Sequence, residues 1–253
     1  MKPDGTLHGK VALITGSSRG IGRAVAWRLA VEGAQVVVHY RANREAAEET
    51  ANEIRQLGSN PLLVGADVRD PRQIKDLFAR IADTYSTLDI LVSNAALGAL
   101  KPALDLSWSK WDMTMEICAR AFLLCAQEAV PLMKANGGHM IAISSLGSRK
   151  YLPNYTAIGA AKAALEAVTR YLAVELAPYR ILVNAVCGGL IETSTLAYFP
   201  ERARMLDDAR KRCPLGRVGQ PVDLANIVAF LCGDDAAWIC GQTIVADGGY
   251  SLV

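Results

Sequence analysis

The sequence predicts a single α/β domain: a doubly wound parallel sheet of the Rossmann type, with helices on both faces. Two observations lead to this prediction. Short apolar segments alternate with longer helical patterns along the whole chain. Several of the short segments are apolar at every position, as strands are when helices cover both faces of a sheet. Because no linker-like or repeated stretch interrupts the 253 residues, we expect residues 1–253 to form one domain.

The alternation defines the expected elements in order. The apolar segments predict strands at residues 11–15, 35–39, 61–65, 90–93, 140–144, 181–185 and 243–246. The patterns between them predict helices at residues 23–32, 44–57, 71–85, 108–136, 155–177 and 221–232. Asp70 followed by Pro71 is a capping carboxylate before a proline at the first helical position, which indicates where the third helix begins.

A glycine-rich turn follows the first predicted strand directly. Residues 15–22 read Thr-Gly-Ser-Ser-Arg-Gly-Ile-Gly and lead into a helix. In this context glycines let the backbone approach a pyrophosphate, whose charge meets the amide groups of the helix N-terminus. The residues expected to bind a dinucleotide here are Gly16, Ser18, Arg19, Gly20, Ile21 and Gly22. The alternative is a tight turn that binds nothing.

The end of the second predicted strand favours NADPH over NADH. An NAD site usually has an acidic residue there for the ribose hydroxyls, but residues 38–44 contain none. Arg41 and Arg44, together with Arg19, could instead neutralise the extra phosphate of NADPH. The alternative is that these arginines are ordinary solvated charges. Asp67 and Val68, after the third strand, are placed to reach the adenine.

Composition excludes several functional classes. Lys and Arg (27) nearly balance Asp and Glu (25), which argues against a general nucleic-acid binder. No apolar run approaches the roughly 20 residues of a membrane helix, and the N-terminal residues lack a signal-peptide hydrophobic region. The six cysteines show no CxxC spacing and the three histidines are scattered, so we expect reduced thiols, no metal site and a cytoplasmic protein.

Further motifs resemble the short-chain dehydrogenase/reductase family over essentially the whole chain. They are Asn94-Ala95 after the fourth strand, Ser145, Tyr155 with Lys162, Asn184 and the closing Asp247-Gly248-Gly249. The resemblance implies catalysis by Tyr155, Lys162 and Ser145. It also implies cofactor contacts from Asn94, Lys162, Gly188, Ile191 and Thr193.

The chain departs from the usual family pattern at its presumed catalytic residues. Cys118 stands where the family has a catalytic Asn, and Ile158 stands where it has the Tyr of a Tyr-x3-Lys pair. Tyr155 precedes Lys162 by seven positions, so both can lie on one helix face. Moving Tyr by three positions shifts its origin by roughly 4.5 Å along a helix.

This shift suits reduction of a conjugated C=C bond. In carbonyl reduction the carbon that accepts hydride carries the oxygen directly, about 1.2 Å away. In enoyl reduction, hydride goes to the β-carbon and charge develops on an oxygen three bonds away. A hydrogen-bond donor must then stand farther from the hydride path, and the displaced Tyr155 provides that distance.

Residues 122–129, 143–148, 154–156, 163–176, 187–189 and 241–244 also resemble the bacterial NADPH-dependent enoyl-acyl-carrier-protein reductases of type III. The resemblance implies NADPH-dependent reduction of trans-2-enoyl thioesters of acyl carrier protein or CoA in fatty-acid elongation. It implies that Tyr155 stabilises the developing enolate, that Lys162 holds the ribose and lowers the pKa of Tyr155, and that Ser145 is secondary. A homotetramer is the expected assembly.

A substrate lid is expected at about residues 192–217. This stretch mixes apolar Leu196, Phe199 and Met205 with basic side chains that could steer an acidic carrier protein. An amphipathic surface helix is the alternative. Two other functions stay open: a carbonyl reductase acting on 3-oxoacyl thioesters, steroids or small ketones, and, more remotely, a non-catalytic dinucleotide-binding protein.

Overall fold

The computed structural model describes residues 5–194, 196 and 202–253 and contains the predicted parallel sheet. Its seven strands lie in the order β3-β2-β1-β4-β5-β6-β7, and every neighbouring pair is parallel. The strands are β1 (Val11–Ile14), β2 (Gln35–Tyr40), β3 (Leu62–Gly65), β4 (Ile90–Ser93), β5 (Gly138–Ser145), β6 (Ile181–Gly188) and β7 (Thr243–Ala246). The strand order reverses between β1 and β4, so the carboxyl ends of these strands open a crevice.

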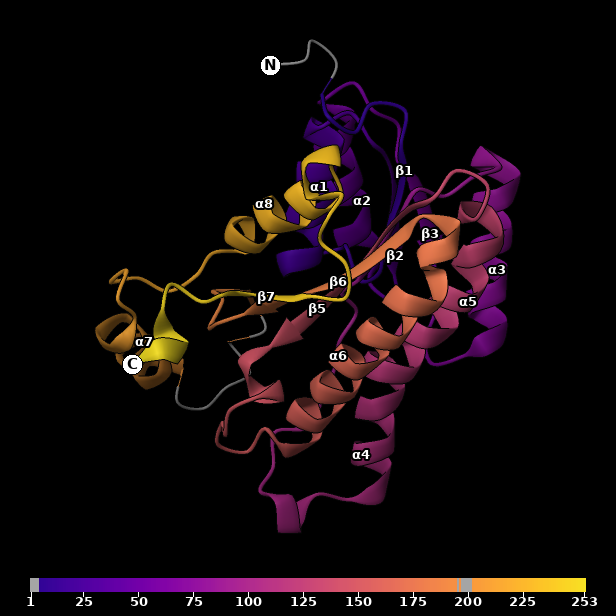
Figure 1. The fold of residues 1–253 in the computed structure, drawn as a ribbon. Helices are drawn as coiled ribbons and strands as arrows, with labels where there is room; N and C mark the ends of the chain where they lie inside the picture. The colour runs from indigo at the N-terminus through magenta and orange to yellow at the C-terminus, as the bar shows by residue number, and fades with distance from the viewer. Residues whose placement is uncertain (1–4, 195, 197–201) are drawn as a thin grey trace.

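The helices cover both faces of the sheet, as Figure 1 shows: α1, α2 and α8 lie on one side, and α3, α5 and α6 on the other. The bounds are α1 (Gly20–Val31), α2 (Arg44–Arg55), α3 (Pro71–Tyr85), α4 (Trp108–Met115), α5 (Ala121–Met133), α6 (Thr156–Leu176), α7 (Arg202–Arg212) and α8 (Pro221–Leu231). The carboxylate of Asp70 accepts a hydrogen bond from Arg72 N, which confirms the predicted cap of α3. No helix in the described part of the chain is long and apolar enough to cross a membrane.

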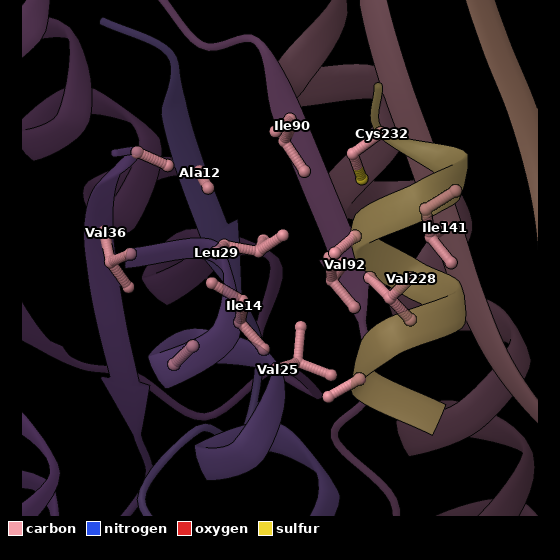
Figure 2. Close-up of a cluster of buried hydrophobic side chains, with 14 of the residues drawn as sticks. Ala12, Ile14, Val25, Leu29, Val36, Ile90, Val92, Ile141, Val228 and Cys232 are labelled. Atoms are coloured by element: carbon pink, nitrogen blue, oxygen red, sulfur yellow. The ribbon is translucent and has the colours of Figure 1, made fainter. Parts of the chain in front are cut away.

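The core consists of two layers that share the sheet. Ala12 and Ile14 of β1 point into the layer formed with α1 and α8, where Val25 and Val228 pack (Figure 2). The alternate residues of β1 point into the opposite layer with α3, α5 and α6. Because side chains alternate along a strand, an apolar residue at every position fills both layers.

The long helix expected at residues 108–136 is interrupted. A π-helical turn, Glu116–Arg120, separates α4 from α5 and buries Ile117 and Cys118. Such turns insert an extra residue into a helix and often occur at functional sites. The residues on both sides of the π-helical turn follow the same helical pattern of apolar side chains, so the sequence pattern does not reveal the turn.

Tyr155 also lies outside the helix predicted to contain it. It is the residue that caps α6, with φ −104° and ψ 11°, and the helix begins at Thr156. The predicted start at residue 155 is therefore early by one residue.

Candidate active site

A cavity of about 1220 Å³ lies at the carboxyl edge of the sheet. It extends from the turn after β1, past the ends of β2 and β3, to the ends of β4, β5 and β6. This is the crevice where open α/β sheets bind their ligands. The predicted residues that line it are Gly16, Ser18, Arg19, Gly20, Ile21, Arg41, Asp67, Val68, Asn94, Ser145, Tyr155, Lys162, Gly188, Ile191 and Thr193.

The glycine-rich turn forms a cradle that fits a phosphate. Gly16 and Gly20 adopt left-handed φ values of 67° and 58°, which glycine reaches without strain. The side chain of Arg19, which caps α1, makes no capping hydrogen bond. The first amides of α1 are therefore left for an anion at the cavity wall.

Two polar side chains hold this turn in place. The Asn94 side-chain amide donates to the carbonyls of Thr15 (2.9 Å) and Gly16 (3.0 Å), while Thr15 Oγ1 accepts from Asn94 N and Ala95 N (both 3.0 Å). Asn94 thus braces the turn from β4 as well as lining the cavity.

Gly22 does not line the cavity, contrary to its predicted place among the cofactor contacts. It is buried, and a Cβ there would lie 2.3 Å from the Gly16 carbonyl oxygen and 2.5 Å from Asn94 Nδ2. Its role in the structure is to let α1 pack closely against the turn.

His39, a buried residue at the cavity edge, is not among the residues predicted from the sequence. Gly16 N–H donates to His39 Nδ1 (2.9 Å), and His39 Nε2, which must carry the proton, donates to the Ala66 carbonyl (3.0 Å). The imidazole therefore joins the glycine turn to the end of β3. Burial lowers the pKa of His39 from 6.5 to about 4, so the ring is neutral at pH 7. The only signal in the sequence is a histidine near the end of an apolar strand.

We expect His39 to make stability fall between pH 6.5 and about pH 4. In this window the unfolded chain binds a proton at residue 39 and the folded chain does not, so acidification favours unfolding. With a folded-state pKa of about 4, the free energy of unfolding should decrease by about 3 kcal/mol across this pH window. Urea unfolding at several pH values gives the free energy of unfolding as a function of pH. Between pH 4 and 6.5 this free energy should change less steeply with pH in His39→Gln than in wild type, but not in His8→Gln, since His8 is exposed. A part of the slope should remain, because burial also lowers the pKa of His139. An unchanged slope in His39→Gln would contradict this assignment.

The three basic residues predicted to select NADPH do not all lie at the cavity. Arg19 and Arg41 line the cavity, whereas Arg44 is not among its lining residues and forms an ion pair with Glu48 along α2 (3.7 Å). Asp67 lines the cavity, with its carboxylate held by Arg69 at 2.6 Å, and the hydrogen bonds from Arg69 keep the pKa of Asp67 below its usual value.

Tyr155 and Ser145 come together in the cavity, and Lys162 lines the same cavity. The Tyr155 hydroxyl lies 3.4 Å from Ser145 Oγ, and Lys162 Nζ donates to the Ile143 carbonyl at 2.6 Å. Burial raises the pKa of Tyr155, so the predicted lowering by Lys162 is not found in this structure. A phenol with a raised pKa stays protonated at neutral pH and can donate a hydrogen bond to an oxygen that gains negative charge.

The residues that replace the family pattern have different surroundings. Cys118 is 1% exposed in the π-helical turn, and its neighbour Ile117 lines the cavity. Ile158 packs so closely on Gly98 that a Cβ at Gly98 would lie 2.2 Å from Ile158 Cγ1. Ile158 therefore occupies the space beside the loop after β4. Among the tyrosines in the described part of the chain, Tyr155 is the one whose hydroxyl lies next to Ser145.

Part of the predicted lid forms a wall of the cavity. Leu196 and, from α7, Met205 line it, while Leu206 is buried against Leu196 and Val218. Phe199 lies outside the described residues, as do residues 195, 197, 198, 200 and 201. Several basic residues of this segment are paired, with ion pairs Arg202–Glu192, Lys211–Asp207 and Arg212–Asp208. The described residues contain no group of three His, Cys, Asp or Glu side chains that could hold a metal.

Comparisons with known proteins agree with this architecture. A family model described as "Enoyl-(Acyl carrier protein) reductase" matches residues 16–251. The chain is 44% identical to 1-cyclohexenylcarbonyl-CoA reductase of Streptomyces collinus over 250 residues, covering 96% of this chain and 88% of the relative. It is 36% identical to a short-chain type dehydrogenase/reductase of Picea abies, covering 96% and 93% of the two chains. The structure of an angucycline C-6 ketoreductase with bound NADP superposes with a TM-score of 0.91, at 36% identity and 98% coverage of both chains.

Proposed function

Because this chain belongs to the short-chain dehydrogenase/reductase family, we propose that it uses NADPH to reduce the conjugated C=C bond of 2-enoyl thioesters. The family and the reductases among its relatives make the chain an oxidoreductase. The choice of NADPH, of a C=C bond and of a thioester on CoA or acyl carrier protein forms the proposal. Fatty-acid elongation is the process that such a reaction serves.

The position of Tyr155 carries the proposal. Ile158 occupies the place of the family's Tyr, and the phenol comes instead from the residue that caps α6. A hydroxyl displaced from the usual place suits a substrate in which charge develops three bonds from the reduced carbon. The name of the relative from Streptomyces collinus supports this reading, since a 1-cyclohexenylcarbonyl thioester is α,β-unsaturated.

Each residue has a role in this reaction. A bound reduced nicotinamide supplies the hydride. Tyr155, kept protonated by burial, donates a hydrogen bond to the thioester oxygen and stabilises the enolate that forms there. The α-carbon of the enolate then takes a proton from solvent, which gives the saturated thioester. Ser145 orients the phenol. Lys162, which lines the cavity, would bind the ribose hydroxyls and add positive charge near the developing anion. The first turn of α1 and Arg41 would hold the phosphates.

Carbonyl reduction is the second candidate, and the comparisons support it better than they support reduction of a C=C bond. A specific observation also favours it. The Tyr155 hydroxyl and Ser145 Oγ are only 3.4 Å apart, so they form the pair that could polarise a ketone despite the shift in sequence. The ketoreductase that superposes on this chain gives the same indication. A non-catalytic dinucleotide-binding role has less support, because the relatives are reductases.

One assay separates the two reactions. NADPH oxidation is followed with crotonyl-CoA and, separately, with acetoacetyl-CoA, and the kcat/KM values are compared. The proposal expects crotonyl-CoA to be consumed with the higher kcat/KM and butyryl-CoA to be the product. Preferential consumption of acetoacetyl-CoA would establish the carbonyl reading instead. Repeating the assay with both acyl groups on acyl carrier protein identifies the carrier.

Arg41→Ala should weaken NADPH binding by roughly 10- to 100-fold, because a hydrogen-bonded contact with a charged group contributes about 1.5–3 kcal/mol. NADH binding should change little, since NADH lacks the additional phosphate. Arg44→Ala is the matched control, because that side chain pairs with Glu48 and does not line the cavity. Fluorescence titration with each nucleotide measures these affinities. Equal losses for NADPH and NADH would argue against a phosphate contact.

The predicted homotetramer remains a proposal. Tyr171 and Val174 on α6 are 72% and 77% exposed, and Leu123 on α5 is also exposed. Apolar side chains on two neighbouring helices are typical of a surface that packs against another subunit.

A further inference from the structure

The ring of Tyr155 lies where the side chain of residue 147 would be. A Cβ built on Gly147 would stand 2.4 Å from Tyr155 Cδ1 and 2.6 Å from Cε1, closer than any real contact allows. Gly147 is not among the residues with positive φ, so its backbone conformation is open to any amino acid. The reason for a glycine at this position is thus the space taken by the phenol ring.

The turn that contains Gly147 also contains Ser145, whose hydroxyl lies next to that of Tyr155. Ser145 Oγ accepts a hydrogen bond from Gly147 N (3.5 Å) and lies 3.4 Å from the Tyr155 hydroxyl. The ring therefore rests on one residue of the turn while its hydroxyl reaches another. A side chain at 147 would push the ring away from the turn and would separate the phenol from Ser145.

The backbone of Tyr155 is fixed from the opposite side. Asn154 has φ of 61°, in the left-handed region that Asn tolerates better than most residues. Its carbonyl accepts from Lys101 N (2.9 Å), and residues 101 and 155 form a parallel bridge. The Tyr155 carbonyl accepts from Gly159 N (2.7 Å). These contacts turn the chain just before α6, so that Tyr155 faces the Ser145 turn.

We infer that Gly147 and Asn154 are positioning residues that together place the Tyr155 hydroxyl at Ser145. Gly147 leaves room for the ring, and the left-handed Asn154 directs the chain toward it. This inference rests on the proposed role of Tyr155 as hydrogen-bond donor, in either candidate reaction. It explains how a tyrosine that precedes the helix can serve the site when Ile158 occupies the family position.

Gly147→Ala tests the first half of the inference. We expect kcat to fall on the order of 10- to 100-fold, because displacements of about 1 Å have effects of that size, while the NADPH dissociation constant stays within about twofold. In a Tyr155→Phe background the same substitution should change kcat less than about twofold, since the hydroxyl it displaces is already absent. Gly233→Ala is the control: Gly233 has φ of −96° and its Cβ would make only ordinary contacts.

Asn154 is tested with a pair of substitutions. Asn154→Gly keeps access to positive φ and should retain kcat within about threefold. Asn154→Val, which is β-branched, should lose about tenfold or more, because it resists this φ. Thermal unfolding of both variants separates a displaced phenol from a chain that no longer folds.

A crystal structure of Gly147→Ala decides the inference independently of the substrate. The expected result is a Tyr155 hydroxyl out of hydrogen-bond distance of Ser145 Oγ. The inference is overturned if the hydroxyl keeps its place, or if Gly147→Ala lowers kcat equally with and without the Tyr155 hydroxyl. If the wild-type protein reduces neither crotonyl-CoA nor acetoacetyl-CoA, the proposed function fails, while the position of the hydroxyl in the variant still answers the question about Gly147.

Discussion

Tyr155→Phe should lower kcat by about 10²- to 10⁴-fold, the range found when a hydrogen-bond donor or general acid is removed from a reacting oxygen. The ring stays in its place against Gly147, because Phe has the same shape without the hydroxyl. NADPH affinity should therefore change little. Steady-state kinetics on the preferred acyl-CoA, with the NADPH dissociation constant from fluorescence, measure both quantities.

Tyr151→Phe is the matched control for this prediction. Tyr151 also lines the cavity, yet its side chain is 87% exposed. A hydroxyl in water contributes little to a buried reaction, so kcat should stay within about twofold of wild type. If Tyr155→Phe retains nearly full activity, another group must meet the substrate oxygen, and both candidate reactions lose their proposed donor.

Hydrophobic pattern was sufficient to predict the framework of the molecule. Each predicted strand exists in the structure. The apolar residue at every position of Val11–Ile14, for example, matches a strand with a layer on both faces. The parallel sheet then brings the carboxyl ends of distant strands to one edge. For this reason Gly16, Asn94 and Ser145, far apart in the sequence, line the same cavity.

Pattern was insufficient where a single backbone angle or contact decides the geometry. The start of α6 after Tyr155 depends on the left-handed Asn154 and on its bridge to the loop after β4, and hydrophobic periodicity reports neither. The π-helical turn at Glu116–Arg120 adds one residue to a helix that is apolar on both sides of it. Such features follow from tertiary packing.

Charge and burial could not be judged from residue type. Arg41 and Arg44 look equivalent in the sequence, yet only Arg41 lines the cavity. His39 is one of three scattered histidines in the sequence, but its hydrogen bonds to Gly16 and Ala66 make it a neutral support of the glycine turn. The pKa of Tyr155 was expected to fall beside Lys162, whereas burial of the phenol raises it.

Lys162→Met should affect activity and stability differently. The Lys162 side chain is 5% exposed, and its Nζ donates to the Ile143 carbonyl. Replacing a buried charge with an apolar side chain of similar length removes a desolvation cost, but it leaves that carbonyl without its donor. Because these two effects oppose each other, we expect the free energy of unfolding to stay within about 1 kcal/mol of wild type, as measured by urea unfolding.

In Lys162→Met, no gain offsets the effect on catalysis of losing the ammonium group. The variant lacks the ammonium proposed to bind the ribose and to stabilise the developing anion, so on that proposal NADPH affinity should fall roughly 10- to 100-fold and kcat by about 10²-fold. Lys150→Met is the control, because Lys150 is exposed and its Nζ contacts the Ser251 carbonyl outside the cavity lining. A folded Lys162→Met protein that binds NADPH as tightly as wild type would show that the buried ammonium serves the fold alone. A stable protein with weak cofactor binding and slow turnover would instead show that the ammonium serves the cofactor and the reaction.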